Sequence, residues 1–410
     1  MSCSFTILSE YGEETFEIAY RSGSFEVNKY SGKYFSKRVY VNGFVYVYSS
    51  VKQSDLDLYD KHYLKSIIKL DQNIYCEEFC SRDFRIGEKF DFDNGLELIK
   101  TISERIRSSG LDCETILVSR NISLKHNVEE YGVESSENRY IHELYVYTYT
   151  VFMGRVVTSS RIIVSNKLRD LFNEIEPVVN NILNNIKNNL RAKSFNPVNT
   201  GKWRVLLTGD SACAFYHEIA HLLEADEPVK LPINYNFNID LKITEDPFYP
   251  GPLQRLFDDE LYPAWRRTIV DDGVVIDYFR TRTSCNGSKP GNARGLFTKP
   301  KPFYHQLIVK PGDWSIDEVM KEFRKILLVE DIFKAELFNN YINIYPETAY
   351  VYENDKWIPV RNILVRIPVN QLNNLFISLT RDINIRYSFE KNNPLYETTP
   401  STLLEAQVLV

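Results

Sequence analysis

The stretch WRVLLTGDSACAFYHEIAHLLEAD, residues 203–226, decides how the second half of the chain folds. It opens with the apolar run at residues 205–207, which is typical of a buried strand, and it turns at Gly209-Asp210. The following residues are mostly apolar or small, and Asp210 or Ser211 can cap a helix at this point. The stretch therefore predicts a buried strand that leads directly into a helix.

The predicted helix carries His217, Glu218 and His221 in the order H-E-x-x-H. Positions i and i+4 share one face of a helix, so the two histidines can direct their imidazole nitrogens at one metal ion. Glu218 lies about 100° round the helix, near enough to hold a metal-bound water and to relay its proton to a leaving amine. The pattern indicates a zinc peptidase with Glu218 as the general base. The other interpretation is a chance spacing of two core histidines and a solvated glutamate.

Glu224 lies on the same stripe of the predicted helix, at i+7 from His217 and i+3 from His221. Its carboxylate can orient a metal ligand or be a ligand itself. It can also be an ordinary carboxylate in water at the end of a helix. The spacing alone leaves these alternatives open.

The N-terminal part of the chain has the alternating pattern of strands. Residues 25–50 alternate apolar and polar side chains, and Asn42-Gly43 between two such runs is the preferred two-residue hairpin turn. Residues 140–164 alternate in the same way and predict two more paired strands. We therefore expect an antiparallel sheet in this half.

Two helices are predicted beside this sheet. Apolar residues recur at helical spacing over about residues 94–108, and again over about residues 166–193, where Pro177 should kink or divide the helix. Asn, Pro, Thr and Gly cluster at residues 194–202, which is typical of a boundary. Beyond it the chain runs strand, helix, and then mostly short strands and turns.

These patterns predict an α+β protein of two domains. Residues 1–200 form an N-terminal antiparallel sheet with helices, and residues 201–410 form a β-rich C-terminal domain that carries the metal-motif helix.

Composition excludes several classes of protein. Hydrophobic residues at 43% and charged residues at 25% are ordinary globular values, which argues against a disordered or coiled-coil chain. The net charge of -6 offers no electrostatic footprint for nucleic acid. We find no apolar run of the roughly 18 to 20 residues that a membrane helix requires. The N-terminus lacks the pattern of a secretory signal, so we expect a cytoplasmic protein that does not engage a membrane.

Five segments share an order with one known family. The segments are HEIAHLLEAD (217–226), ITEDPFYPGPLQRLFDDE (243–260), RRTIVDDGVVIDYFRTRTSCNG (266–287), PGNARGLFTKPKPFYHQLIV (290–309) and PGDWSIDEVM (311–320). In this order they resemble five segments of the TldD/PmbA (TldD/TldE) metallopeptidases. The family's segments are the H-E-x-x-x-H-x-L-E-x-D helix, the D-D-P…F-D-D-E-G segment, a strand-turn-strand element, a G-N-x-R motif with a proline-spaced strand, and the G-D…E-E-L start of a helix. The resemblance covers roughly residues 130–410.

The resemblance implies a cytoplasmic zinc-dependent peptidase of α+β fold that acts on small or unfolded peptides. It also implies a heterodimer with a homologous TldE/PmbA-like subunit that lacks the metal motif, although a homodimer is the other arrangement. A second interpretation stays open, in which this chain is itself a catalytically silent subunit that shapes the substrate chamber of an active partner. Which peptides are cut, and whether cleavage is internal or terminal, the sequence does not determine.

This sequence departs from the family at three positions. The motif helix is one residue shorter, with H-E-x-x-H in place of H-E-x-x-x-H. The family takes its third metal ligand from a cysteine near the C-terminus, whereas the last cysteine here is Cys285. The family's arginine in the proline-spaced strand corresponds to Phe303.

The third metal ligand is therefore open, and chemistry ranks the candidates. His305 lies in the strand that the family places near its active site, and imidazole suits zinc. Glu245 follows His221 by 24 residues and could complete a site of two histidines and one glutamate. Glu390, near the missing cysteine, and Glu224 are the other candidates. For substrate binding, Asn292 and Arg294 could grip a peptide backbone or carboxylate, because arginine offers a bidentate fork.

Overall fold

The structure is a computed structural model that describes residues 4–41, 44–58, 74–353, 356–390 and 393–410. The predicted Asn42-Gly43 turn lies outside these residues. The strands that flank it pair antiparallel, with Val41 opposite Phe44, as the alternating pattern predicts.

Seven strands of the described residues form the first sheet, in the order β3-β2-β1-β5-β6-β4 with β7 paired to β6. The sheet is antiparallel apart from β4, which pairs with β6 in parallel. The strand pair expected within residues 140–164 is confirmed by β6 and β7, which are aligned from His142↔Ser165 to Phe152↔Arg155. The strands are β1 (Ser4–Arg21), β2 (Ser24–Val41), β3 (Phe44–Ser50), β4 (Asp83–Ile86), β5 (Asp112–Val128), β6 (Val133–Phe152) and β7 (Arg155–Ser165).

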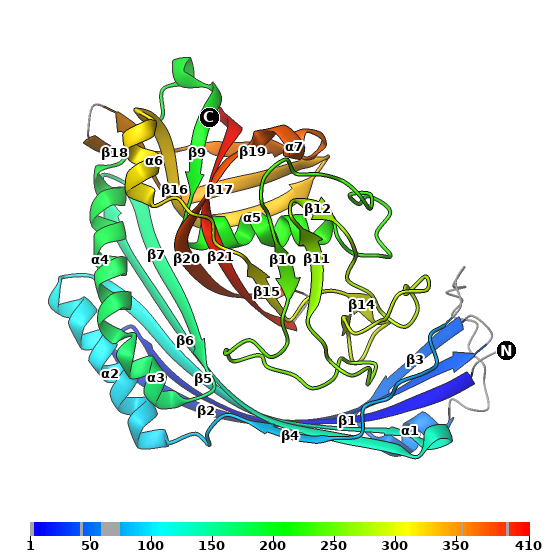
Figure 1. The fold of residues 1–410 in the computed structure, drawn as a ribbon. Helices are drawn as coiled ribbons and strands as arrows, with labels where there is room; N and C mark the ends of the chain where they lie inside the picture. Colours follow the sequence, from blue (N-terminus) through cyan, green and yellow to red (C-terminus); the bar gives the residue numbers. More distant parts are fainter. Residues whose placement is uncertain (1–3, 42–43, 59–73, 354–355, 391–392) are drawn as a thin grey trace.

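Helices α2, α3 and α4 lie along the outer side of this sheet (Figure 1). The expected first helix is confirmed as α2 (Phe92–Ser108), in which the side chain of Asp91 accepts the Asn94 N–H as the N-cap. The expected second helix is divided into α3 (Leu168–Asn173) and α4 (Ile175–Arg191). The division places Pro177 in the first turn of α4. Backbone N–H groups there have no hydrogen-bond partner within the helix, so a proline, which lacks the N–H, costs no helical hydrogen bond.

The second sheet contains twelve strands of the described residues. Its centre is β9, which pairs with β16 in parallel and with β21 antiparallel. The strands are β8 (Lys193–Ser194), β9 (Gly201–Leu207), β10 (Ile243–Glu245), β11 (Arg267–Asp271), β12 (Val274–Val275), β15 (Gln306–Val309), β16 (Lys325–Phe338), β17 (Tyr341–Glu353), β18 (Lys356–Arg361), β19 (Leu364–Pro368), β20 (Phe376–Glu390) and β21 (Asn393–Leu409).

The remaining elements are short, apart from the motif helix. They are a two-stranded ribbon of β13 (Ala293–Arg294) and β14 (Lys301–Pro302), and the helices α1 (Gln53–Leu58), α5 (Gly209–His221), α6 (Ile316–Glu322) and α7 (Leu372–Leu375). No helix in the described part of the chain is both long and apolar enough to cross a membrane.

The long strands of the first sheet curve beneath the second sheet and the loops around β10, β11 and β14 (Figure 1). Buried polar contacts join the two parts: Arg161 of β7 forms an ion pair with Asp331 of β16 at 2.7 Å, and Tyr387 of β20 donates to Glu143 of β6 at 3.3 Å. The overall class is therefore α+β and rich in strand, as expected. The division near residue 200 stays a prediction, because β8 already belongs to the second sheet.

Candidate metal centre

Helix α5 is held at its N-terminus by a residue from a distant strand. The backbone N–H of Gly209 donates to Oδ1 of Asn384 in β20 at 2.7 Å, and the N–H of Thr208 donates to Oγ of Ser211 at 3.1 Å. The N-cap is thus Thr208, so the expectation that Asp210 or Ser211 would cap the helix is wrong by two or three residues. The whole of residues 211–220 is buried, because α5 packs against β16, β20 and β21.

His217 is fixed by polar partners behind its ring. Its Nδ1 lies 2.6 Å from the Tyr304 hydroxyl and 3.3 Å from Oε1 of Glu397, and that hydroxyl donates to Glu397 at 2.8 Å. Burial disfavours the ionised form of Glu397, but the charge of Arg386 and the hydrogen bond from His217 outweigh it and lower its pKa below the ordinary value. An ionised Glu397 favours a proton on Nδ1 of His217, which leaves Nε2 as the free acceptor.

His221 has the same type of support. Its Nδ1 lies 2.6 Å from Oε1 of Glu224, and its ring stacks on Phe303 with centroids 4.8 Å apart and planes at 21°. Burial opposes protonation of His221, but the hydrogen bond and charge of Glu224 prevail and raise its pKa above the ordinary value. Glu224 therefore orients the imidazole from behind, and Phe303 packs on the face of the ring.

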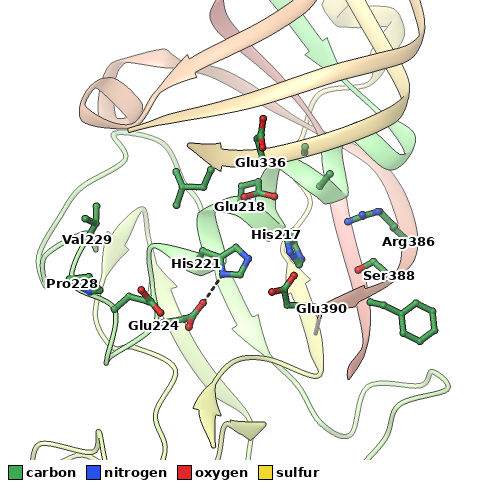
Figure 2. A pocket seen from close by; sticks show the side chains of 15 residues that line it. His217, Glu218, His221, Glu224, Pro228, Val229, Glu336, Arg386, Ser388 and Glu390 are labelled. Carbon is green, nitrogen blue, oxygen red and sulfur yellow. Dashed lines mark hydrogen bonds and ion pairs between the residues drawn. The ribbon is translucent and has the colours of Figure 1, made fainter. Parts of the chain in front are cut away.

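The third group beside the two imidazoles is Glu390, at the end of β20. One ligand atom from each of His217, His221 and Glu390 lies within 4.8 Å of the other two. Figure 2 shows the Glu390 carboxylate directed toward both rings, on the side away from Glu218. Because both Nδ1 atoms are engaged by other partners, the Nε2 atoms are the ones available to a shared cation.

Glu218 lines the same cavity, which has a volume of about 560 Å³. Its side chain lies beside the two imidazoles, toward Glu336 of β16 (Figure 2). Only 7% of the surface of Glu218 is exposed. A carboxylate so placed can exchange a proton with a water molecule inside the cavity while bulk water is largely excluded.

The other candidate ligands lie elsewhere. Nδ1 of His305 is 3.2 Å from Oε1 of Glu245, and Nε2 of His305 contacts Nη1 of Arg255. His305 and Glu245 are therefore engaged with each other in a buried ionic network. The structure brings Glu390 to the pair of imidazoles instead.

The two candidate substrate-binding residues differ in their placement. Oδ1 of Asn292 accepts the backbone N–H of Arg280 at 3.1 Å, so its side chain braces a loop inside the protein. Arg294 lines a second cavity, which also reaches His221 and Glu390.

Sequence reasoning did not single out Tyr304 and Glu397. Glu397 lies in β21 and is followed by the buried threonines Thr398, Thr399 and Thr402. A carboxylate next to a run of uncharged buried residues, 398–404, was the signal that could have identified it, because such a group requires a partner. For Tyr304 the only sequence signal was its position next to Phe303.

Known proteins resemble this chain in sequence and in fold. Residues 236–406 match the family model of the PmbA/TldA metallopeptidase C-terminal domain. The chain is 25% identical over 161 residues to Metalloprotease MJ0996 of Methanocaldococcus jannaschii, an alignment that covers 36% of this chain and 36% of that protein. It thus spans about a third of the length of this curated relative.

Two solved structures have the same fold over nearly the whole chain. The TM0727 protein of Thermotoga maritima matches with a TM-score of 0.78 and 15% identity, covering 99% of this chain and 96% of that one. TldE from Thermococcus kodakarensis matches with a TM-score of 0.76 and 13% identity, covering 99% and 97%. Residues 236–406 therefore resemble the C-terminal domain of the PmbA/TldA metallopeptidases, and the whole chain has the fold of these two structures; both findings support a divergent member of the TldD/PmbA family.

Proposed function

We propose that this chain is a zinc-dependent peptidase that hydrolyses small or unfolded peptides. His217, His221 and Glu390 are the metal ligands, and Glu218 is the general base. The observation that carries the proposal is the convergence of three ligand atoms within 4.8 Å of one another, on a helix and a strand separated by more than 160 residues. A chance H-E-x-x-H spacing would not recruit a carboxylate from another element.

The donor set suits a catalytic zinc ion. Two imidazoles and one carboxylate are a common three-ligand set for catalytic zinc, which keeps the fourth position open. Each imidazole also has a hydrogen-bonded partner behind it, Glu397 with Tyr304 in one case and Glu224 in the other. Such partners fix the tautomer and raise the basicity of the ligand nitrogen. The family's metallopeptidase assignment implies a divalent metal, and the imidazole nitrogens favour zinc over magnesium or calcium.

The residues of the cavity account for the steps of hydrolysis. When bound, the metal supplies a Lewis acid that polarises the peptide carbonyl and lowers the pKa of the attacking water toward about 7. Glu218 accepts the proton of that water and passes it to the leaving nitrogen. Glu397 and Glu224 keep the two imidazoles oriented through both steps.

We further propose that the chain assembles with a homologous subunit or with a second copy of itself. The similarity to TldE in fold supports a homologous partner. The silent-subunit alternative stays open, and zinc content separates it from the enzyme. The cytoplasmic location stays a prediction from the sequence.

The test begins with elemental analysis of the purified chain. We expect about one zinc per chain, which is lost in His217→Ala and retained in His142→Gln. His142 is a matched control because it is a buried histidine of the first sheet, bonded to Ser119 at 2.9 Å. No zinc at any loading would support the silent subunit.

Peptide hydrolysis then tests the general base. Glu218→Gln should abolish hydrolysis while zinc stays bound. Glu104→Gln, an exposed carboxylate of α2, is the control for the same chemical change and should retain activity. Hydrolysis at full rate in Glu218→Gln would remove the proposed base.

A further inference from the structure

A second cavity of about 930 Å³ leads from the metal centre to a buried arginine. His221 and Glu390 line one part of it, and Arg294 lines another. The cavity lies between the curved first sheet and the C-terminal part of the chain, and Phe297, Phe303 and Phe389 contribute aromatic walls. Its contents would therefore face both the metal ligands and Arg294.

Arg294 is buried, and it forms no ion pair with a carboxylate in the described part of the chain. It is 6% exposed, and its Nη2 donates to the carbonyl oxygen of Pro394 at 2.8 Å. Among the described residues, its buried Nε has no hydrogen-bond partner. Burial and then the charge of Arg255 lower the pKa of Arg294 to about 9. A buried guanidinium with unused donors is costly unless an anion completes it.

Two carboxylates that line this cavity, Asp259 and Glu137, are engaged by other arginines. Asp259 lies 3.0 Å from Nη1 of Arg255, and its other oxygen accepts the Gly295 N–H at 2.8 Å. Glu137 lies 2.8 Å from Nη2 of Arg139. Among the described residues, neither carboxylate forms an ion pair with Arg294.

A third carboxyl group nearby, that of Glu245, is engaged by His305. Burial raises the pKa of Glu245 well above its usual range, against the charges of nearby arginines. Its Oε1 accepts the backbone N–H of His305 at 3.1 Å. Arg294 thus lines the cavity while the carboxylates around it are engaged by other groups.

We propose that Arg294 binds the C-terminal carboxylate of the peptide substrate, so that the enzyme cleaves close to the C-terminus. The proposal rests on the proposed peptidase function. Arginine presents two parallel N–H donors that match the two oxygens of a carboxylate. The aromatic walls of the cavity provide an apolar environment for the terminal side chain.

The position of Arg294 sets how near the cut lies to the terminus. Its partner Pro394 pairs with Phe389 across the β20–β21 hairpin, one residue from the pair Glu390↔Asn393. This register places Arg294 beside the end of the hairpin that carries Glu390, and both residues line the same cavity. We therefore expect cleavage close to the C-terminus of the peptide.

Calorimetric titration tests the proposal without turnover. The zinc-loaded Glu218→Gln chain is titrated with the tripeptide Ala-Ala-Phe as the free acid and as the C-terminal amide. Hydrogen bonds to a charged group contribute about 1.5 to 3 kcal/mol, so we expect the free acid to bind about ten- to a hundred-fold more tightly. Equal affinity for the two peptides would overturn the proposal.

Arginine variants in the same background locate the carboxylate. Arg294→Gln should reduce the affinity for the free acid to that for the amide, and Arg294→Lys should retain part of the preference because it keeps the charge. Arg105→Gln on the exposed face of α2 is the matched control and should leave the preference intact. A preference that survives in Arg294→Gln would place the carboxylate on the metal and overturn the assignment.

Two further comparisons separate the sources of failure. The amide of Ala-Ala-Glu offers its carboxylate only on a side chain, and a gain equal to that of the free acid would overturn recognition of the chain terminus. Because binding needs no catalysis, a wild-type chain that hydrolyses nothing counts against the proposed function only. A measured carboxylate preference would still stand in that case.

Discussion

Replacing Tyr304 with phenylalanine tests whether the groups behind His217 tune the metal centre. Burial raises the pKa of Tyr304 well above its usual range, so its hydroxyl stays protonated and donates to Glu397 at 2.8 Å. The oxygen of that hydroxyl is then the acceptor for Nδ1–H of His217 at 2.6 Å. Tyr304→Phe removes this acceptor and keeps the ring.

The expected cost follows from what remains. Without the hydroxyl, Nδ1 of His217 keeps only Glu397, at 3.3 Å, which is longer than an ordinary N–H···O bond. Loss of such a partner weakens metal binding by about 10- to 100-fold, or about 1.4 to 2.7 kcal/mol. We expect the lower part of this range, because Glu397 also stays held by Ser388 at 2.8 Å and can shift toward the imidazole.

The assay is competition for zinc with a chromophoric chelator, which gives the dissociation constant of each variant. Tyr216→Phe is the matched control, because Tyr216 is a buried tyrosine of α5 whose hydroxyl lies 2.9 Å from that of Thr402 and bonds neither imidazole among the described residues. Zinc affinity should fall in Tyr304→Phe and not in Tyr216→Phe. An equal change in the two variants would refute the reasoning, because the loss would then be one of general packing.

Three other predictions concern the third ligand and the stability of the fold. Glu390→Ala should release zinc, whereas Glu390→Cys should retain it because thiolate is a zinc ligand. If elemental analysis finds the zinc content of both variants unchanged, Glu390 is not the third ligand. Burial, followed by the charge of Asp331, raises the pKa of Glu330 to about 7. The folded protein therefore favours the protonated form of Glu330, and this contribution to stability is present below about pH 4.5 and lost as the pH rises through about 7. Thermal unfolding should therefore show that Glu330→Gln gains stability relative to wild type on going from about pH 5 to about pH 8, and a constant difference would contradict this. Gly273→Ala should lower the free energy of unfolding by more than about 1 kcal/mol, because Gly273 has φ 74 and a Cβ would lie 2.3 Å from the Ile239 carbonyl oxygen. Chemical denaturation measures this free energy. A variant with the denaturation midpoint of wild type would show that the added methyl group causes no strain.

Local patterns were sufficient for the parts of the molecule that local rules govern. The helix at α2 follows from apolar spacing and the turn at its end, and the pairing of β6 with β7 follows from alternation on both sides of a short turn. Residues four apart on a helix share a face wherever the helix lies in the protein. That is why the two proposed ligands and the proposed base could be predicted together without any knowledge of the tertiary structure.

The division of α3 from α4 shows where a local rule stops being precise. Proline at position 177 predicts a kink or a break, but not its place. The structure breaks the helix at Glu174, so that Pro177 falls in the first turn of the next helix. The choice depends on how each segment packs against the first sheet.

The sequence by itself determined that this chain is an α+β protein with one helix able to present two imidazoles and a carboxylate to a shared cation. Only the tertiary structure decided that Glu390 faces these imidazoles, that Tyr304 and Glu397 support one of them, and that Arg294 closes a cavity beside them. The physical reason is that strand register is set by pairing partners far along the chain, and a shift of one residue turns every side chain of a strand to the opposite face. Helical spacing is a property of neighbours, whereas the faces of β20, β21 and β13 are settled only when the sheets are assembled.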